Sequence, residues 1–296
     1  MKLFLSKLLL YFLLTFIFLL VLDFFVFPQN TNVMSVKNDL LKNENTEILV
    51  LGNSHTFFGI NPDFIKRTTI NVANKSRKLE VDYFILRKNI KDLKKLRLVV
   101  LPISSYTLFT EKVSKKEKRL YYNFYKLKEY DQGLYYNSLV FHESFKELIE
   151  NALFKTTNVS KSGWIANSEV YKFDKEIINT RIGNVNESLS RKSTIKLNLN
   201  YLKQVIDLCE IHNVKLMLLL PPYHPDFYLF TNNEYDKEIK KYIKTIDLKS
   251  GNLLDSKSFN ITEDIYFENV DHLNRKGAEI FSKKLAKDIN QLFINE

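Results

Sequence analysis

The chain has 296 residues, a length that suits one α/β domain with an insertion or two small domains. Hydrophobic residues make up 45% and charged residues 26%, which excludes a disordered tail and a polytopic membrane protein. The lone cysteine, Cys209, excludes an internal disulfide and a cysteine-based zinc site, and the net charge of +10 raises the question of a nucleic-acid partner.

The N-terminal segment is strongly apolar. Residues 8–27 contain one charged residue, Asp23, and a helix of this length spans a hydrocarbon core of about 30 Å. Lys2 and Lys7 precede the run, so we expect the N-terminus inside and the remaining chain outside the cytoplasmic membrane, in the periplasm or at the cell surface. A cleaved signal peptide is the alternative, but its apolar core is usually about 7–15 residues and ends at small residues. We therefore predict an uncleaved signal-anchor over residues 1–28.

The positive charge of the remaining chain is interleaved with acidic residues. The densest basic run, at 112–119, fits a solvated lysine-rich face better than a nucleic-acid patch. An exported domain also meets little nucleic acid. We predict no nucleic-acid partner, and an anionic membrane surface or an acidic glycan suits the charge better.

After a polar linker at 29–45, strands and helices alternate along the chain. Short apolar runs predict buried strands, at 47–51, 70–72, 96–103 and 214–220. Amphipathic spacing predicts helices, at 79–95, 196–212, 234–247 and 275–293. This alternation indicates an α/β domain over 46–296 with a mostly parallel sheet that is covered on both sides.

Residues 107–195 fit the alternation poorly. They are rich in Tyr, Asn and Lys and hold the single tryptophan, Trp164. We interpret them as an insertion over the carboxyl edge of the sheet, which is where ligands bind in open α/β folds.

The first segment with a candidate catalytic residue is the turn that follows the strand at 47–51. Gly52 ends this strand, and Ser54 follows two residues later, which places Ser54 at the carboxyl edge of the sheet. If a helix begins at Ser54, its backbone N–H also favours a developing oxyanion. The alternative is that the Ser54 hydroxyl only caps that helix.

The second segment lies just before the last predicted helix. Five histidines are present: His55, His142, His212, His224 and His272. Among them His272 follows an acid, Asp271, and a serine nucleophile needs such a base with an acceptor that fixes its tautomer. The alternative is a surface loop that caps the helix. His224 follows the strand at 214–220, where either a substrate contact or a loop role is open. The spacing of the histidines excludes a helical metalloprotease motif, and nothing in the sequence suggests a metal site built from scattered His and Asp.

Together these segments resemble the SGNH (GDSL-type) hydrolase superfamily. The matching text is LGNSHTFFGINPDFI (51–65), INVANKSRKLEVDYFIL (70–86), KLMLLLPPYHPDFY (215–228) and FENVDHLNRKGAEIFS (267–282). The similarity is greatest to the membrane-anchored branch that includes the D-alanylation protein of lipoteichoic acid synthesis and the alginate and peptidoglycan O-acetyltransferases. It implies a three-layer α/β/α sandwich.

The resemblance also implies roles for single residues. Ser54 falls on the nucleophile and His272 on the general base. The oxyanion pattern N-x-G-x-x-G becomes Asn71-x-Ala73-x-x-Ser76, in which the Ser76 backbone N–H remains a donor. The family's further oxyanion-hole Asn has no counterpart in residues 102–105.

The orienting acid is the main departure from the family. The family places Asp three residues before the histidine, where this chain has Asn269. Asn accepts a hydrogen bond from the imidazole but carries no charge to stabilise imidazolium. Of the nearby carboxylates, Glu268 and Asp271, we take Asp271 as the orienting acid and Asn269 as the alternative.

The sequence thus predicts acyl-ester chemistry, either O-acyl transfer or ester hydrolysis, on a cell-envelope glycan. No metal or diffusible cofactor is expected, and the resemblance implies a membrane-bound O-acyltransferase as partner for a transferase. The alternative, favoured by Asn269, is a catalytically inactive protein of this fold that binds glycan or assembles an acylation complex.

Overall fold

The computed structural model describes residues 1–23, 33–144, 146, 148–149, 158–231 and 234–294. These residues form two compact units. Unit 1 comprises residues 1–38 and 114–158, and unit 2 comprises residues 39–113 and 159–296.

The core of unit 2 is a five-stranded parallel sheet with strand order β2-β1-β3-β4-β5. Its strands are β1 (Ile48–Val50), β2 (Thr69–Asn71), β3 (Leu98–Pro102), β4 (Lys215–Leu220) and β5 (Asn252–Asp255). The first four are the short apolar runs of the sequence, and nearly all of their residues are buried. The predicted α/β class with a parallel sheet is therefore confirmed.

The register of the sheet brings several chain segments to one edge. Val50 of β1 pairs with Asn71 of β2 and with Val100 of β3. Because the three strands are parallel, the turns that follow them leave the sheet at its carboxyl edge. Ser54 and Ser76 lie in two of these turns.

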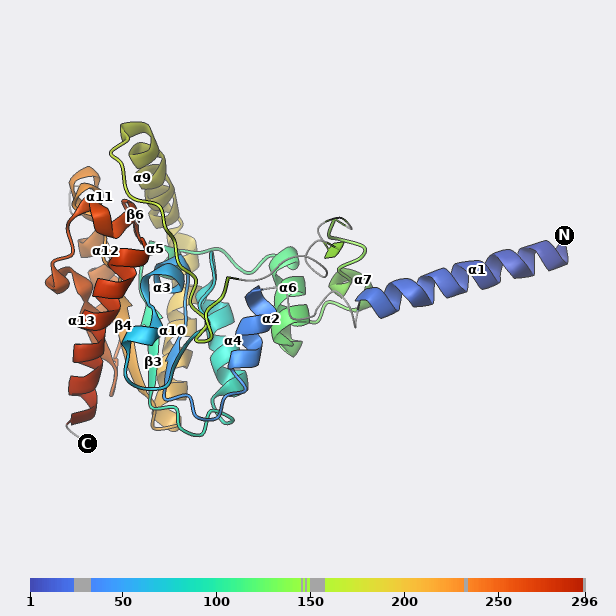
Figure 1. The fold of residues 1–296 in the computed structure, drawn as a ribbon, viewed down its shortest axis with the longest axis horizontal. Helices are drawn as coiled ribbons and strands as arrows, with labels where there is room; N and C mark the ends of the chain where they lie inside the picture. The colour runs from blue at the N-terminus through green and yellow to red at the C-terminus, as the bar shows by residue number, and fades with distance from the viewer. Residues whose placement is uncertain (24–32, 145, 147, 150–157, 232–233, 295–296) are drawn as a thin grey trace. The chain divides into compact units, whose positions relative to one another are not determined.

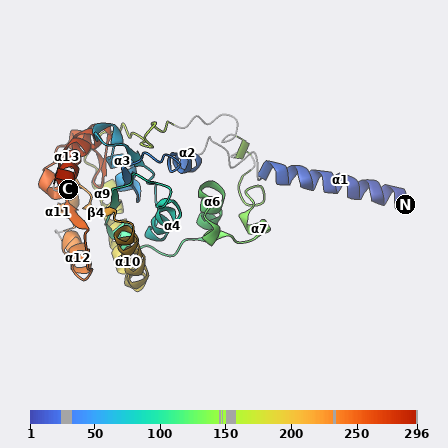
Figure 2. The same cartoon turned by 90° about the horizontal axis from the view of Figure 1, so that it is seen from below.

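Helices flank the sheet of unit 2, as Figures 1 and 2 show. The helices of this unit are α3 (Ser54–Gly59), α4 (Leu79–Asn89), α5 (Ser105–Leu108), α9 (Lys175–Ser190), α10 (Ile195–Ile211), α11 (Pro225–Phe230), α12 (Glu234–Ile243) and α13 (Arg275–Ile294). Helix α10 packs against α4, and α13 packs against α3. In Figure 1, α13 lies on one side of the strands, and α10 and α4 lie on the other.

A two-stranded antiparallel sheet precedes α13. It consists of β6 (Phe267–Asn269) and β7 (His272–Leu273), and the pairing is irregular between Phe267 and Asn269. Asn274, which directly follows β7, is fixed next to the start of β6, because its side-chain amide donates to the carbonyl oxygens of Ile265 and Phe267. This small sheet therefore carries the candidate base and its candidate orienting residues.

Unit 1 contains helices α1 (Lys2–Val21), α6 (Lys115–Tyr125) and α7 (Leu134–Asn137) and most of α2 (Val33–Leu40). Helix α1 has a mean hydropathy of 2.4, and none of its side chains is buried, so it is long and apolar enough to cross a membrane or to be a signal sequence. The predicted anchor extends to residue 28 and the linker starts at 29, so this boundary lies in residues 24–32, outside the described residues. Helix α2 occupies the middle of the expected linker at 29–45. The expected insertion at 107–195 is divided, because α6 and α7 belong to unit 1 whereas α9 belongs to unit 2.

Candidate active site

The turn between β1 and α3 requires glycine. Gly52 has φ +109°, and a Cβ atom at this position would lie 2.2 Å from the ring carbons of Pro102. Its backbone N–H donates to the carboxylate of Asp82 over 3.1 Å. The chain therefore turns sharply at the end of β1 and presents the next residues above the edge of the sheet.

Ser54 is the first residue of helix α3, and the capping residue is Asn53. The Asn53 side chain accepts a hydrogen bond from the backbone N–H of His55. The Ser54 hydroxyl is thus not the cap of α3, which is the alternative role that the sequence leaves open. Its Oγ lies 2.8 Å from Nε2 of His272, within hydrogen-bond distance.

Two side chains contact the other nitrogen of His272. Nδ1 lies 3.2 Å from Oδ1 of Asn269 and 3.2 Å from Oδ1 of Asp271. Asn269 also accepts the backbone N–H of Asp271, so it shapes the turn between β6 and β7. Both residues that the sequence offers as orienting groups therefore reach the imidazole.

Asp271 supplies a buried negative charge beside His272. Arg181 of α9 donates to Oδ1 of Asp271 over 3.1 Å. Burial by itself raises the pKa of the Asp271 carboxyl, but the positive charges of His272 and Arg181 and the hydrogen bond with His272 outweigh burial and hold the pKa well below its ordinary value. Asp271 is therefore ionised at neutral pH and can stabilise imidazolium.

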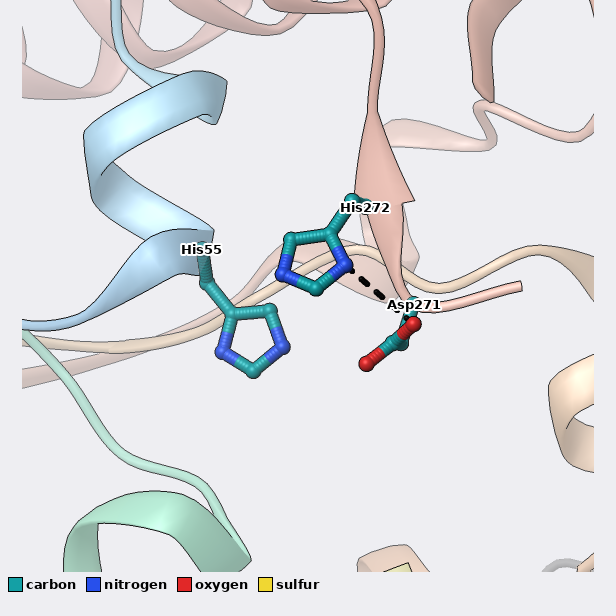
Figure 3. A group of neighbouring side chains, drawn as sticks. All are labelled: His55, Asp271 and His272. Atoms are coloured by element: carbon teal, nitrogen blue, oxygen red, sulfur yellow. Dashed lines mark hydrogen bonds and ion pairs between the residues drawn. The ribbon is translucent and has the colours of Figure 1, made fainter. Parts of the chain in front are cut away.

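His55 lies next to the candidate base (Figure 3). Its ring stacks on that of His272 with centroids 5.1 Å apart and contacts the Tyr223 ring edge-on. Neither nitrogen of His55 has a hydrogen-bond partner among the described residues. Burial, reinforced by repulsion from His272, lowers the pKa of His55 to about 3. His55 is thus neutral, and its uncharged ring packs against the ring of the candidate base, His272.

A pocket of about 260 Å³ opens in front of Ser54 and His272. Its lining comprises Asn53, Ser54, Ser76, Lys78, Tyr106, Thr110, Glu111, Arg181, Arg191, Asp271 and His272. Ser76 reaches it in a left-handed conformation, with φ +54°. The pocket therefore holds the candidate nucleophile, the base and the segment from which an oxyanion N–H is expected.

The structure places two further predicted residues away from this pocket. The Asn71 amide donates to the carbonyl oxygens of Thr56 and Ile60, so it ties β2 to α3. His224 caps α11 by accepting from the N–H of Asp226 and contacts Asp264 over 3.0 Å. Neither of them is among the described residues that line the pocket, and the loop role left open for His224 is the one that its contacts support.

Three side chains at the site are close enough together to be considered as ligands of a metal ion. His55, Asp271 and His272 offer three ligand atoms within 4.8 Å of one another. However, the two imidazole planes are stacked at 22°, so their lone pairs do not converge on one point. The Arg181 guanidinium also donates to Oδ1 of Asp271, so this carboxylate is already paired with a positive charge. The geometry fits proton transfer between Ser54 and His272 better than metal binding.

Two residues of the site, Arg181 and His55, are not predicted from the sequence to take part in the chemistry. Arg181 is one arginine on an amphipathic helix inside the expected insertion, and no local pattern distinguishes it from a solvated charge. His55 had a usable signal, because it adjoins the nucleophile at the start of a helix. Tyr106 and Asn53 join the site only through the turns that follow β3 and β1.

Comparisons with known proteins add little to this geometry. The profile of one protein family matches residues 177–294, a stretch that contains Arg181, Asp271 and His272. No curated protein sequence matches the chain. The solved structures that match include one from Streptococcus pneumonia described as "a putative platelet activating factor", with 13% identity, a TM-score of 0.43, and coverage of 87% of this chain and 90% of the other. Similarity at this level carries no argument about the chemistry.

Proposed function

We propose that the chain is a serine-dependent enzyme of the SGNH type, with a three-layer α/β/α domain, that acts on acyl esters. The observation that carries the proposal is the 2.8 Å contact between Ser54 Oγ and His272 Nε2, combined with an ionised Asp271 at Nδ1. A hydroxyl, an imidazole and a buried carboxylate in this order are the parts of a serine hydrolase triad. The charge of His272, its hydrogen bond with Asp271 and the charge of Arg181 keep this carboxylate in its charged form.

The reaction follows from the two nitrogens of His272. Ser54 Oγ attacks the ester carbonyl carbon while Nε2 accepts the hydroxyl proton. Asp271 stabilises the imidazolium that results. The tetrahedral intermediate then expels the alcohol, which takes the proton from Nε2 and leaves an acyl-Ser54 ester. A second hydroxyl, from a sugar or from water, gives its proton to Nε2 and attacks the acyl group. Nε2 then returns the proton to Ser54 Oγ as the bond to the acyl group breaks, which frees Ser54 and releases the new ester or the acid.

The proposed setting is outside the cytoplasmic membrane. Helix α1 is long and apolar, which supports a single-pass anchor, and Lys2 and Lys7 support an N-terminus inside. We propose a cell-envelope polysaccharide as the acyl acceptor or as the esterified substrate. For a transferase, a membrane-bound O-acyltransferase would deliver the acyl group. The pocket volume of about 260 Å³ suits a small acyl group rather than a long acyl chain.

A second candidate is a protein that has kept the fold and lost the reaction. It would bind glycan or assemble an acylation complex. Asn269 supports it, because this uncharged side chain shares Nδ1 of His272 with Asp271 at the same 3.2 Å. If Asn269 rather than Asp271 takes the N–H, the developing imidazolium is not neutralised, a loss that costs about 10⁴ in turnover in another serine enzyme.

The test compares variants of the full-length protein in detergent. Wild type should hydrolyse a fluorogenic acetyl ester and react with a serine-directed phosphonate. Ser54→Ala and His272→Ala should abolish both signals, since loss of either residue costs about 10⁶ in turnover in another serine hydrolase.

Ser76→Gly is the matched control. Glycine tolerates φ +54° and keeps the backbone N–H, so this variant should retain labelling. Labelling that persists in Ser54→Ala would reject the nucleophile. Absence of labelling and turnover in a folded wild-type protein would favour the non-catalytic candidate.

A further inference from the structure

The end of helix α1 is tied to a distant part of unit 1. The side chain of Asp23, two residues beyond α1, is 3% exposed and accepts the backbone N–H of Leu139 over 2.6 Å and of Val140 over 3.1 Å. A buried carboxylate is costly unless it is hydrogen-bonded, so these contacts hold the two segments together. The segment around Leu139 therefore lies at the level where the apolar helix ends.

Exposed apolar side chains flank the two residues, Leu139 and Val140, that donate to Asp23, and most of them are aromatic, so we call them the aromatic patch. We define it as Leu134, Tyr135, Tyr136 and Phe141, whose side chains are 44–58% exposed. The Tyr135 ring contacts those of Tyr136 and Phe141, with centroids 5.2 and 5.8 Å apart. The rings thus gather in one place but remain open to the surroundings. A cluster of large exposed apolar side chains marks a surface that has a partner.

Hydrogen bonds hold the patch against α6, and a lysine lies on it. The Asn123 amide of α6 donates to the carbonyl oxygen of Asn137, which fixes α7 against α6. Lys115, at the first turn of α6, lies over the Tyr136 ring at 5.0 Å. Lys115 belongs to the basic run at 112–119, which plays no part in the proposed catalysis. Tyrosine and lysine together are typical of the boundary between a membrane and water.

We propose that the aromatic patch lies in the headgroup region of the membrane that α1 spans, with Asp23 as the link. The twenty helical residues of α1, at about 1.5 Å each, cross a core of about 30 Å while the long side chains of Lys2 and Lys7 reach back to the cytoplasmic surface, so Asp23 falls at the opposite membrane surface. The tie from Asp23 to residues 139 and 140 brings the patch to the same depth. Lys115 then faces anionic lipid headgroups. The inference rests on the proposed anchoring by α1 and not on the serine chemistry.

Spin labels on the full-length protein test this depth. A Cys209→Ala background removes the single cysteine, and Leu134→Cys introduces a label without loss of an aromatic ring. The protein is reconstituted in vesicles of phosphatidylglycerol and phosphatidylethanolamine. Collision of the label with oxygen, relative to a water-soluble nickel chelate, reports depth. Phe12→Cys in α1 and the exposed Lys203→Cys in α10 serve as lipid and water references.

The proposal expects the label at Leu134 to favour oxygen, as at Phe12, and to differ from Lys203. A label that favours nickel at Leu134 but oxygen at Phe12 would overturn the patch and point to a protein partner. Nickel preference at both sites would overturn the anchoring itself.

Two variants test the link. Asp23→Ala removes the acceptor and should move the Leu134 label towards water, whereas Asp23→Asn keeps an oxygen acceptor and should leave its depth unchanged. Equal depth in both variants would exclude Asp23 as the link.

Discussion

The two nitrogens of His272 set the chemistry at the scale of single residues. Nε2 faces Ser54, and Nδ1 faces Asn269 and Asp271 at the same distance. Since an imidazole has one proton on Nδ1, only one acceptor dominates. Asp271 carries the charge and the contact with Arg181, while Asn269 is already engaged with the Asp271 backbone N–H. These contacts favour Asp271 as the group that stabilises imidazolium.

This assignment predicts a clear order of activities. Asp271→Asn should lower turnover by up to about 10⁴, or roughly 5 kcal/mol, because the orienting charge is lost. Asn269→Ala should cost far less. The measurement is hydrolysis of a small acetyl ester at fixed pH. An Asp271→Asn variant as active as wild type, together with a more active Asn269→Asp variant, would show that Asn269 holds the orienting position.

The sequence predicts the contact of Ser54 with His272 but not the whole site. A serine after a strand and turn, and a histidine before the last helix, are local patterns that the sheet edge brings together. His224 has the same topological position, yet its ring nitrogens contact Asp226 and Asp264. Position at an edge does not determine where a side chain points, so contacts of this kind need the structure.

At the scale of elements, α4 supports the turn that presents Ser54. Asp82 of α4 accepts the N–H of Gly52, and its carboxylate lies 3.6 Å from the guanidinium of Arg77. Both side chains are buried. Arg77 directly follows Ser76, so one ion pair links the nucleophile turn with the expected oxyanion segment.

The burial of Asp82 predicts a pH-dependent stability. Burial outweighs the opposing charge of Arg77 and raises the pKa of Asp82 to about 6, from an ordinary value of 3.8. The folded state therefore binds more protons than the unfolded state between these values, and its stability falls as pH rises through them. The difference corresponds to about 3 kcal/mol.

Asp82→Asn removes this titration and keeps an acceptor for Gly52. The unfolding free energy of wild type, relative to this variant, should decrease by about 2 kcal/mol between pH 4 and pH 7, which is most of the full difference. Urea unfolding followed by fluorescence reports on unit 2, because Trp164 is the single tryptophan. If the unfolding free energy of wild type relative to Asp82→Asn stays constant or increases with pH, the charge of Arg77 offsets or outweighs the effect of burial on the pKa of Asp82.

Periodicity predicts most of the elements but not all of their limits. The predicted helix at 79–95 ends at Asn89, although the apolar residues Ile90 and Leu93 remain buried in the following turns. Helical spacing of apolar residues therefore continued beyond the helix. Strand β5 (Asn252–Asp255) escaped prediction because it is a half-exposed edge strand of four residues without a long apolar run.

At the scale of the whole molecule, the division into units depends on contacts that are distant in sequence. Local composition predicts one insertion at 107–195, yet residues 114–158 group with residues 1–38. The bonds of Asp23 with Leu139 and Val140 bridge more than a hundred residues. No local sequence pattern predicts hydrogen bonds between residues so far apart, whereas the 20-residue apolar helix that precedes Asp23 is evident from composition alone.

The apolar helix predicts an anchored chain with its bulk outside the cytoplasm. Lys2 and Lys7 stay on the cytoplasmic side, because lysines near a membrane helix resist translocation. Protease added to intact spheroplasts should therefore degrade the bulk of the chain, and a carbonate wash should leave the untreated protein in the membrane. Lys2→Glu/Lys7→Glu removes the orienting charge and should increase the protected fraction, with Lys66→Glu/Lys91→Glu as the charge-matched control. A fully protected wild-type chain would refute the orientation, and a soluble, shortened product would identify residues 1–28 as a cleaved signal peptide.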